Sequence, residues 1–131
     1  MPDINENVTM VGLAAVVATG SGADYINADA LGALFFLEIT LVAGTTPTLD
    51  IKLQAKDPTS GQYQDIPGAA FAQKTAAGRD MLAIYPSLIE TANKKVSFRL
   101  PRVFRFYWTL GGTTPSFTFS IGASLLRGTP L

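Results

Sequence analysis

Turn-forming residues interrupt this chain at short intervals, and this spacing limits its fold more than any other feature. Clusters of Gly and Pro recur roughly every 8 to 15 residues. The runs between them are rich in Val, Ile, Phe, Tyr and Thr, which favour strands. No stretch keeps a helical apolar period over three turns, and the best helical candidate, residues 87–93, spans one or two turns. The pattern predicts an all-β fold: an antiparallel β-sandwich, jelly-roll or Ig-like, of about eight strands.

Two pairs of runs are predicted to form β-hairpins. Residues 103–110 and 117–121 alternate apolar and polar side chains, and the glycine-rich linker between them is of hairpin length. Residues 35–41 and 49–53 repeat this arrangement upstream. The strands of each pair are expected to run antiparallel. The positions expected to face the core are Phe35, Leu37, Ile39, Leu41, Leu49, Ile51, Leu53, Phe104, Phe106, Trp108, Leu110, Phe117, Phe119 and Ile121.

The two linkers share a sequence pattern. Gly44-Thr45-Thr46-Pro47-Thr48-Leu49 recurs 68 residues later as Gly112-Thr113-Thr114-Pro115-Ser116-Phe117. Either the repeat is a coincidence of common turn residues, or it marks two pseudo-symmetric hairpins, one in each sheet of a sandwich. The strands that precede the linkers differ in parity by one residue. One of the two loops is therefore expected to absorb an extra residue, as a β-bulge does.

The chain is long enough to form one domain with its own core. Residues 1–7 are polar and lack a strand pattern, which predicts an N-terminal arm followed by a single sandwich domain over residues 8–131. Asp3 and Glu6 occur before the apolar run 10–18 without any Lys or Arg, so this segment does not resemble a secretory leader. Residues 8–17 are nearly all apolar, which predicts a strand that is buried on both faces or covers an interface. Residues 68–80 are expected to form a loop that is free to clasp a neighbour.

The absence of cysteine and histidine restricts the chemistry of the chain. It excludes disulfides and thiolate metal sites, and it removes the commonest general base near pH 7 and the commonest zinc ligand. We therefore assign no catalytic residue, cofactor or metal, and expect that the protein is not an enzyme.

Ten basic and ten acidic residues give a formal net charge of zero, which argues against a nucleic-acid binder. Little charge repulsion separates copies of the chain, so self-association is expected. The apolar run 10–18 is also too short to span a membrane.

The densest basic feature consists of Arg99, Arg102 and Arg105. One interpretation is a patch that docks on an acidic protein surface or contacts nucleic acid, and the zero net charge favours the protein surface. The other is a solvated sheet face, whose arginines pair across strands with Asp50 or Glu38. The candidate partner-binding residues, drawn from this cluster and from the arm, are Arg99, Arg102, Arg105, Asp3, Ile4 and Asn5.

An aromatic run near the C-terminus raises the possibility of a sugar-stacking platform. Phe104, Phe106 and Trp108 share the parity that fits the core, so Tyr107 is the one ring of this run that is expected to point outward. An aromatic stripe at strand spacing is more often core than ligand site. A glycan-binding β-sandwich module therefore remains the alternative interpretation, with Tyr107 as its test.

The order of motifs resembles a family of small structural proteins of tailed phages, the head decoration or capsid cement proteins. The resemblance covers roughly residues 30–125 and consists of turn and strand patterns. The motifs that carry it are Gly44-Thr45-Thr46-Pro47-Thr48-Leu49-Asp50-Ile51-Lys52-Leu53-Gln54, a turn with Asp57 and Gly61, Tyr63-Gln64-Asp65-Ile66-Pro67-Gly68-Ala69-Ala70-Phe71, Phe98-Arg99-Leu100-Pro101, and Arg105-Phe106-Tyr107-Trp108-Thr109-Leu110-Gly111-Gly112.

This resemblance implies a β-sandwich that binds the outside of an assembled phage capsid, commonly as a trimer at local threefold positions. The implied partners are the major capsid protein and other copies of the chain, and the implied location is the exterior of the virion. Neither nucleic acid nor membrane is an expected partner. A neck or tail protein of the virion with a similar sandwich is a further alternative.

Overall fold

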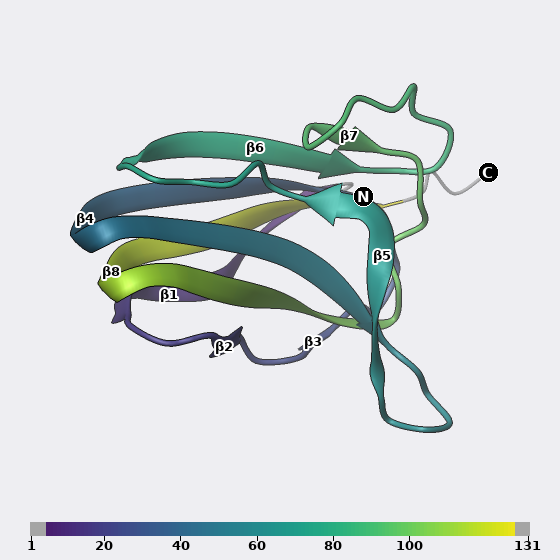
Figure 1. Cartoon of the computed structure of the whole chain (residues 1–131). Coiled ribbons are helices and arrows are strands. Elements are labelled where there is room, and N and C mark those ends of the chain that lie inside the picture. Colours follow the sequence, from purple (N-terminus) through teal and green to yellow (C-terminus); the bar gives the residue numbers. More distant parts are fainter. Residues whose placement is uncertain (1–4, 128–131) are drawn as a thin grey trace.

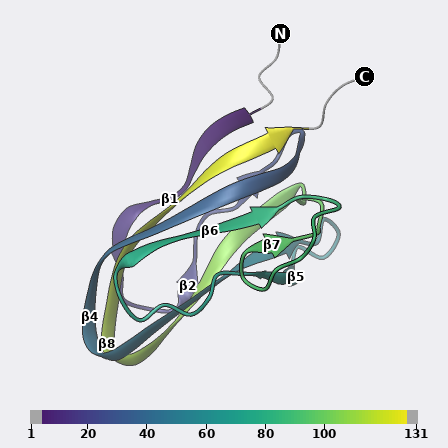
Figure 2. The same ribbon diagram turned by 90° about the horizontal axis from the view of Figure 1, so that it is seen from above.

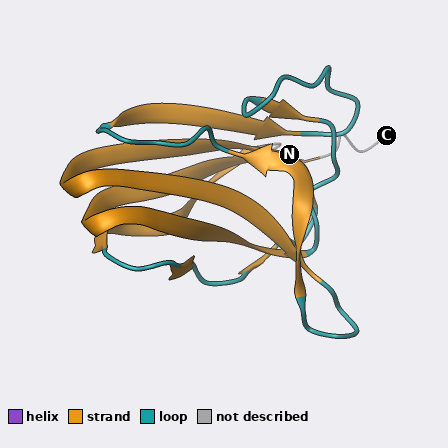
Figure 3. Ribbon diagram, viewed as in Figure 1, coloured by secondary structure: helices purple, strands orange, loops and turns teal. Residues whose placement is uncertain are grey.

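The computed structural model of the chain describes residues 5–127. Within them every regular element is a strand and there is no helix (Figure 3), so the expected all-β class is confirmed. Residues 87–93, the helical candidate, form turns and irregular structure. The strands are β1 (Asn5–Val16), β2 (Gly20–Ser21), β3 (Tyr25–Ile26), β4 (Ala30–Lys56), β5 (Tyr63–Ala70), β6 (Gly78–Ile84), β7 (Lys95–Val96) and β8 (Val103–Arg127).

The two longest strands, β4 and β8, pair with each other and do not form two hairpins. They run antiparallel along almost their whole length, from Ala30 opposite Arg127 to Ala55 opposite Phe104. The two runs that were predicted to form each hairpin lie in one continuous strand, so both predicted hairpins are wrong. The sequence signal was correct about strands and about a change of direction, but it did not identify the partner of each strand.

Both long strands bend at the repeated Gly-Thr-Thr-Pro sequences, and this corner is visible at the left of Figure 1. Because the paired strands bend together, the two-stranded ribbon folds over and its halves face each other as two layers (Figure 2). We name them by their residues. Layer A contains β1, residues 116–127 of β8, residues 30–43 of β4, β6 and β7, and layer B contains β2, β3, residues 103–111 of β8, residues 48–56 of β4, and β5.

Hydrogen bonding continues through the corner, so the eight strands form one open mixed sheet. The main path runs in the order β1-β8-β4-β6-β7, and only the β6–β7 pair is parallel among the described strands. β2 and β3 pair with β8, and β5 pairs with β4. The predicted turn over residues 57–61 connects β4 to β5 and projects from the body of the molecule (Figure 1).

The core lies between the two layers and is built from the alternate positions of both long strands. Phe35 of layer A packs edge-on against Phe106 of layer B, with ring centroids 4.9 Å apart. Trp108 of layer B meets Phe119 of layer A in the same way at 5.4 Å. These cross-layer contacts show that the folded ribbon is a sandwich, because strand pairing does not bring the two residues of either pair together.

A β-bulge in β4 changes which residues face the core. Between Ile39 and Leu41 the pairing with β8 shifts by one residue. As a result Leu41, predicted to face inward, is 64% exposed, while Val42 packs against the core. Leu110 of β8, which the repeat aligns with Val42, is half-buried against the core. The extra residue required by the parity difference is therefore absorbed within a strand and not in a loop.

The sequence repeat corresponds to a repeated backbone conformation at the corner. Gly44 and Gly112 have φ angles of 112° and 100°. Thr46 and Thr114 follow in the left-handed region, at 48° and 44°. The repeat is thus a local pseudo-two-fold within one ribbon, not a pair of hairpins. The repeat relates Ala43 to Gly111 and Thr48 to Ser116. The cross-strand pair Ala43–Ser116 therefore corresponds to the pair Gly111–Thr48.

Strand β1 differs from its prediction in extent and in burial. It begins at Asn5, opposite Leu126 of β8, so the last part of the predicted arm belongs to the sheet. It is an edge strand of layer A, and residues 12–15 are exposed, so β1 is not buried on both faces. The other interpretation of this apolar run, an interface with another molecule, stays a prediction.

The predicted loop over residues 68–80 is largely held against the body of the protein. β5 extends into it from one side and β6 from the other. Between them Phe71 is buried, and its N–H donates to the Ile51 carbonyl at 3.0 Å. Lys74 and Leu49 exchange both backbone hydrogen bonds, at 2.8 and 2.9 Å. The expectation of a free loop is therefore wrong, because its one large apolar side chain completes the core.

Candidate functional site

The two outer faces of the sandwich differ in chemistry, and layer B carries the charged one. Lys52 Nζ lies 2.9 Å from Asp65 Oδ2, and Gln54 donates to the other oxygen of this carboxylate at 3.0 Å. The Tyr63 hydroxyl donates to Asp24 at 2.7 Å. The hydrogen bond from Lys52, and then that from Gln54, holds the pKa of Asp65 below its ordinary value, and the Tyr63 hydrogen bond lowers the pKa of Asp24. The face therefore satisfies its own polar groups.

Arg105, one of the predicted docking residues, is held within this layer B network. Its Cζ atom lies 3.4 Å from the centre of the Tyr63 ring, a stacked cation–π contact. Its Nε donates to Gln54 Oε1 at 2.9 Å, and its Nη1 donates to Ser21 Oγ at 3.2 Å. These contacts come from strands β2, β4 and β5. Arg105 therefore ties the strands of layer B together.

The carboxylates that were expected to pair with the arginine cluster have other partners. Asp50 accepts a hydrogen bond from Gln73 at 3.0 Å, and Glu38 accepts one from Arg79 at 2.9 Å. Arg105 instead bonds to Gln54. The expected pairing is therefore wrong. Its physical reason is the β4–β8 register, which places Gln54 directly opposite Arg105.

Two of the other predicted partner-binding residues, Arg99 and Arg102, are not part of the layer B network. Arg99 and Arg102 are exposed in the segment between β7 and β8. Asn5 is the first residue of β1, and Asp3 and Ile4 lie outside the described residues. Partner binding by these five residues stays a prediction.

Tyr107 lies on the outer face of layer B, as the alternation predicted, and is half-buried. Lys52 Nζ lies 5.4 Å from the centre of its ring, and Arg105 Cζ lies 5.8 Å from it. The neighbouring ring, Tyr63, is covered by Arg105 itself. Cationic groups therefore approach both tyrosines of this face, whereas a sugar-stacking platform needs bare rings.

The outer face of layer A carries an apolar patch next to the exposed Arg79–Glu38 ion pair. Phe36 of β4 and Met81 of β6 are cross-strand neighbours, 42% and 50% exposed. Leu34 and Ala83 form the next pair along the same two strands and are half-buried. We call Leu34, Phe36, Met81 and Ala83 the layer A patch. A patch of this kind on a sheet face is a typical site of protein contact.

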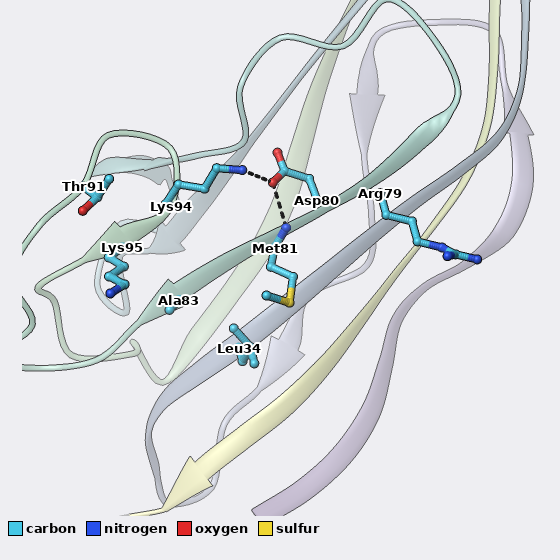
Figure 4. A pocket seen from close by; sticks show the side chains of 8 residues that line it. All are labelled: Leu34, Arg79, Asp80, Met81, Ala83, Thr91, Lys94 and Lys95. Atoms are coloured by element: carbon cyan, nitrogen blue, oxygen red, sulfur yellow. Dashed lines mark hydrogen bonds and ion pairs between the residues drawn. The ribbon is translucent and has the colours of Figure 1, made fainter.

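A groove lies beside this patch, between β6 and the segment that leads into β7 (Figure 4). Its cavity volume is about 660 Å³. Leu34, Met81 and Ala83 contribute its apolar lining. The charged and polar residues around it are Arg79, Asp80, Thr91, Lys94 and Lys95. A volume of this size falls within the range of small-molecule sites.

Asp80 is the only buried charged residue in the described part of the chain. Its carboxylate lies 2.6 Å from Lys74 Nζ and 2.5 Å from Lys94 Nζ, and it accepts the Met81 N–H at 2.8 Å. Burial raises the pKa of Asp80, but the hydrogen bonds from Lys74, Lys94 and the Met81 N–H together lower it below its ordinary value. The carboxylate is thus charged at neutral pH. Its ion pair with Lys94 links β6 to the segment that leads into β7.

Strand β1 provides a second apolar surface at the edge of layer A. No charged side chain occurs from residue 7 to residue 23. Leu13 is 61% exposed, and Val17, just beyond the strand, is 67% exposed. The pairing of β1 with β8 shifts at two places, which indicates bulges. Bulges hinder the addition of a further strand to an edge, so a partner here is expected to bind through side chains.

Sequence reasoning missed the layer A patch, although the signal was present. If Phe35 and Leu37 face the core, strand alternation places Phe36 on the outer face. The same argument applies to Met81, which adjoins the buried Leu82. Alternation does not predict that β4 pairs with β6, and this pairing brings Phe36 and Met81 together.

Residues 5–127 contain no cluster of three or more carboxylate, histidine or cysteine groups arranged to hold a metal ion. The same residues include no helix with the length and hydropathy needed to cross a membrane. Comparison with known protein families, with curated proteins and with solved structures found no match for this chain.

Proposed function

We propose that this chain is a structural protein of a phage virion that binds the outer surface of the assembled capsid and stabilises the shell. The motif order that resembles head decoration proteins supports this proposal, and so does the contrast between the two outer faces. Layer B pairs its polar groups internally, whereas the layer A patch leaves Phe36 and Met81 exposed without a partner in the chain. This contrast is the observation that carries the proposal, because it distinguishes a docking face from a solvated one.

Copies of the chain associate with one another as well as with the shell, as a trimer around a local threefold axis. The charge-free stretch from residue 7 to residue 23, which includes most of β1, supports this step, since exposed Leu13 and Val17 present apolar area without repulsion between copies. The layer A patch then faces the major capsid protein. Both surfaces belong to layer A, so one side of the molecule serves assembly.

The stabilising effect follows from mass action. A protein that binds the assembled shell but not dispersed subunits lowers the free energy of the shell and leaves that of the subunits unchanged. Its contribution grows with the number of occupied sites. No bond is made or broken, and the energy comes from apolar area that is buried on docking.

The test mixes the purified protein with undecorated expanded capsids and, separately, with free capsid subunits, and separates bound from free protein by sedimentation. We expect binding to capsids and not to subunits, with a higher temperature of capsid disruption. Equal binding to both, or binding to neither, rejects the proposal. Immunogold labelling of finished particles distinguishes a head location from a neck or tail location.

A matched pair of variants locates the docking face. Phe36→Glu with Met81→Glu places two charges on the layer A patch and is expected to weaken capsid binding by about a hundredfold, since charge is depleted at interface cores. Thr109→Glu with Gln64→Glu adds the same charge at exposed positions of layer B. This control is expected to bind like the original chain. If it is the control that loses binding, the docking face is layer B.

A further inference from the structure

The groove beside the layer A patch combines an apolar lining with a cationic rim. Met81, half exposed, forms part of the lining together with Leu34 and Ala83. Methionine adapts its shape to different apolar partners. Lys94 and Lys95 lie on the β7 side of this lining, and Arg79 lies on the other side, with its side chain directed away from the two lysines (Figure 4). A ligand that fills the groove therefore needs apolar groups next to acidic ones.

The rim carries a net positive charge although the whole chain is neutral. The one carboxylate in the lining, Asp80, is shared between Lys94 and Lys74, and Lys74 is not part of the lining. Arg79 bonds to Glu38 through Nε, but its side chain is 83% exposed. A guanidinium has five N–H donors, so further donors of Arg79 remain for a second carboxylate. The local excess of cations favours an anionic ligand.

The edge of β6 is already occupied at this point, which excludes one mode of recognition. The Ala83 N–H donates to the Lys94 carbonyl at 2.8 Å, and the Tyr85 N–H donates to the Val96 carbonyl at 3.1 Å. The Met81 N–H is taken by the Asp80 side chain. A peptide therefore finds these main-chain donors satisfied and cannot add as a strand alongside them. It must be recognised by its side chains.

We propose that this groove binds an acidic, apolar peptide segment of a partner protein, with aliphatic side chains on the Leu34–Met81–Ala83 lining and carboxylates on Arg79, Lys94 and Lys95. The inference rests on the proposed docking function and names the chemistry of the partner. It assigns the cationic contacts of docking to the groove and not to the predicted cluster of Arg99, Arg102 and Arg105.

Methionine methyl groups provide a direct readout in the free protein. The chain has three methionines. Met81 lies in the groove, and Met10 lies on β1. In a sample labelled with ¹³C-methyl methionine, Met81→Leu identifies the Met81 signal by its loss. The Met10 signal then serves as an internal control on the same layer of the sandwich.

The probes are three capped pentapeptides and an oligothymidylate. Asp-Leu-Asp-Leu-Asp carries both required groups, Lys-Leu-Lys-Leu-Lys reverses the charge, and Asp-Ser-Asp-Ser-Asp removes the apolar part. We expect the first peptide to shift the Met81 methyl signal, to leave Met10 unchanged, and to bind more weakly as salt is raised. Equal shifts from the charge-reversed or serine peptide, or a shift of Met81 by oligothymidylate alone, overturn the proposal.

Charge variants test the rim. Arg79→Gln with Lys95→Glu is expected to weaken binding of the Asp-Leu peptide by about tenfold, since rim charges act through screened, surface-exposed contacts. Arg102→Gln with Arg99→Glu makes the same change in charge at exposed positions between β7 and β8 and is expected to leave binding unchanged. Fluorescence of the single Trp108 checks that each variant is folded. If both pairs weaken binding equally, only net charge matters and the groove is rejected.

The peptide experiment and the capsid experiment test the two proposals independently. If the protein binds capsids and the Asp-Leu peptide leaves Met81 unchanged, the groove proposal is wrong and docking through the layer A patch stands. If the peptide binds in the groove and capsids are not bound, the proposed function is wrong and the groove is a peptide site for another partner.

Discussion

Gly44 and Gly112 each lie against the backbone of the opposite strand at the corner of the sandwich. A Cβ atom on Gly44 would lie 2.7 Å from the Thr114 carbonyl oxygen, and one on Gly112 would lie 2.6 Å from the Thr46 carbonyl oxygen. The two approaches are related by the pseudo-two-fold of the repeat. Close packing of two bends, without side chains between them, is what lets the β4–β8 ribbon fold over while its strands stay paired.

Gly44→Ala and Gly112→Ala are each expected to lower the free energy of unfolding by about 3 kcal/mol. The positive φ is unfavourable for alanine, and the added Cβ would overlap with the backbone of the opposite strand. Gly61→Ala is the matched control, since Gly61 also has a positive φ, 76°, but a Cβ there meets nothing within 4 Å. It is expected to cost about 1 kcal/mol. Denaturant unfolding measures all three. Equal losses in the three variants would show that close approach at the corner is unimportant.

Arg105→Ala is expected to destabilise the protein by about 1.5 kcal/mol, through loss of the Tyr63 stack and of the hydrogen bonds to Gln54 and Ser21. Arg105→Lys should recover less than half of this loss, since an ammonium group lacks the planar fork. Arg99→Ala, at an exposed position, is expected to change stability by no more than about 0.5 kcal/mol. Thermal unfolding compares the three. A loss at Arg99 as large as that at Arg105 would contradict the structural role of Arg105.

Asp80→Asn is expected to cost about 2 kcal/mol at pH 7, because Lys74 and Lys94 lose their shared carboxylate. The pKa of Asp80 is lower in the folded protein than in the unfolded chain. Its carboxylate therefore stabilises folding above the unfolded pKa of about 3.9, and the contribution is lost as pH falls through the folded pKa.

The stability difference between the original chain and Asp80→Asn should thus be constant from pH 5 to 7, because Asp80 is ionised in both the folded and the unfolded state about one unit or more above its unfolded pKa. The difference should shrink below about pH 4. Denaturant titrations at several pH values measure it. Other carboxylates titrate in both proteins and cancel in the difference. A difference that grows on acidification would mean that Asp80 is neutral in the folded protein.

The solution mass of the original chain, measured by light scattering, is expected to be three times the 13.9 kDa of one chain. Leu13→Lys with Val17→Lys should shift it toward the monomer, because two charges would be buried at the β1 edge. Stability of the monomer should change by less than about 0.5 kcal/mol, since both side chains are exposed.

Thr59→Lys with Gln64→Lys adds the same charge on the projecting β4–β5 hairpin, at exposed positions. This pair should leave the mass unchanged. Loss of association in both pairs would assign the effect to net charge, and retention in both would show that β1 is not the contact.

Alternation predicted the buried positions better than it predicted the pairing. Phe35, Phe106 and Phe119 are buried as expected, because the side-chain period of a strand is a local property. Leu41 failed because a bulge shifts the register within β4, and no residue near it marks the bulge. For the candidate surfaces, the sequence could indicate that Phe36 points outward, but its contact with Met81 depends on the β4–β6 register.

The sequence by itself determined the strand class, the face of most core residues and the places where the chain turns, since each depends on neighbours a few positions apart. Only the tertiary structure decided that the Gly-Thr-Thr-Pro segments are paired bends of one ribbon. A hairpin and a bend satisfy the same local pattern, and the choice is made by hydrogen bonds and core contacts between strands that lie far apart in the chain. The same long-range pairing left one outer face with a self-satisfied polar network and gave the other the exposed layer A patch.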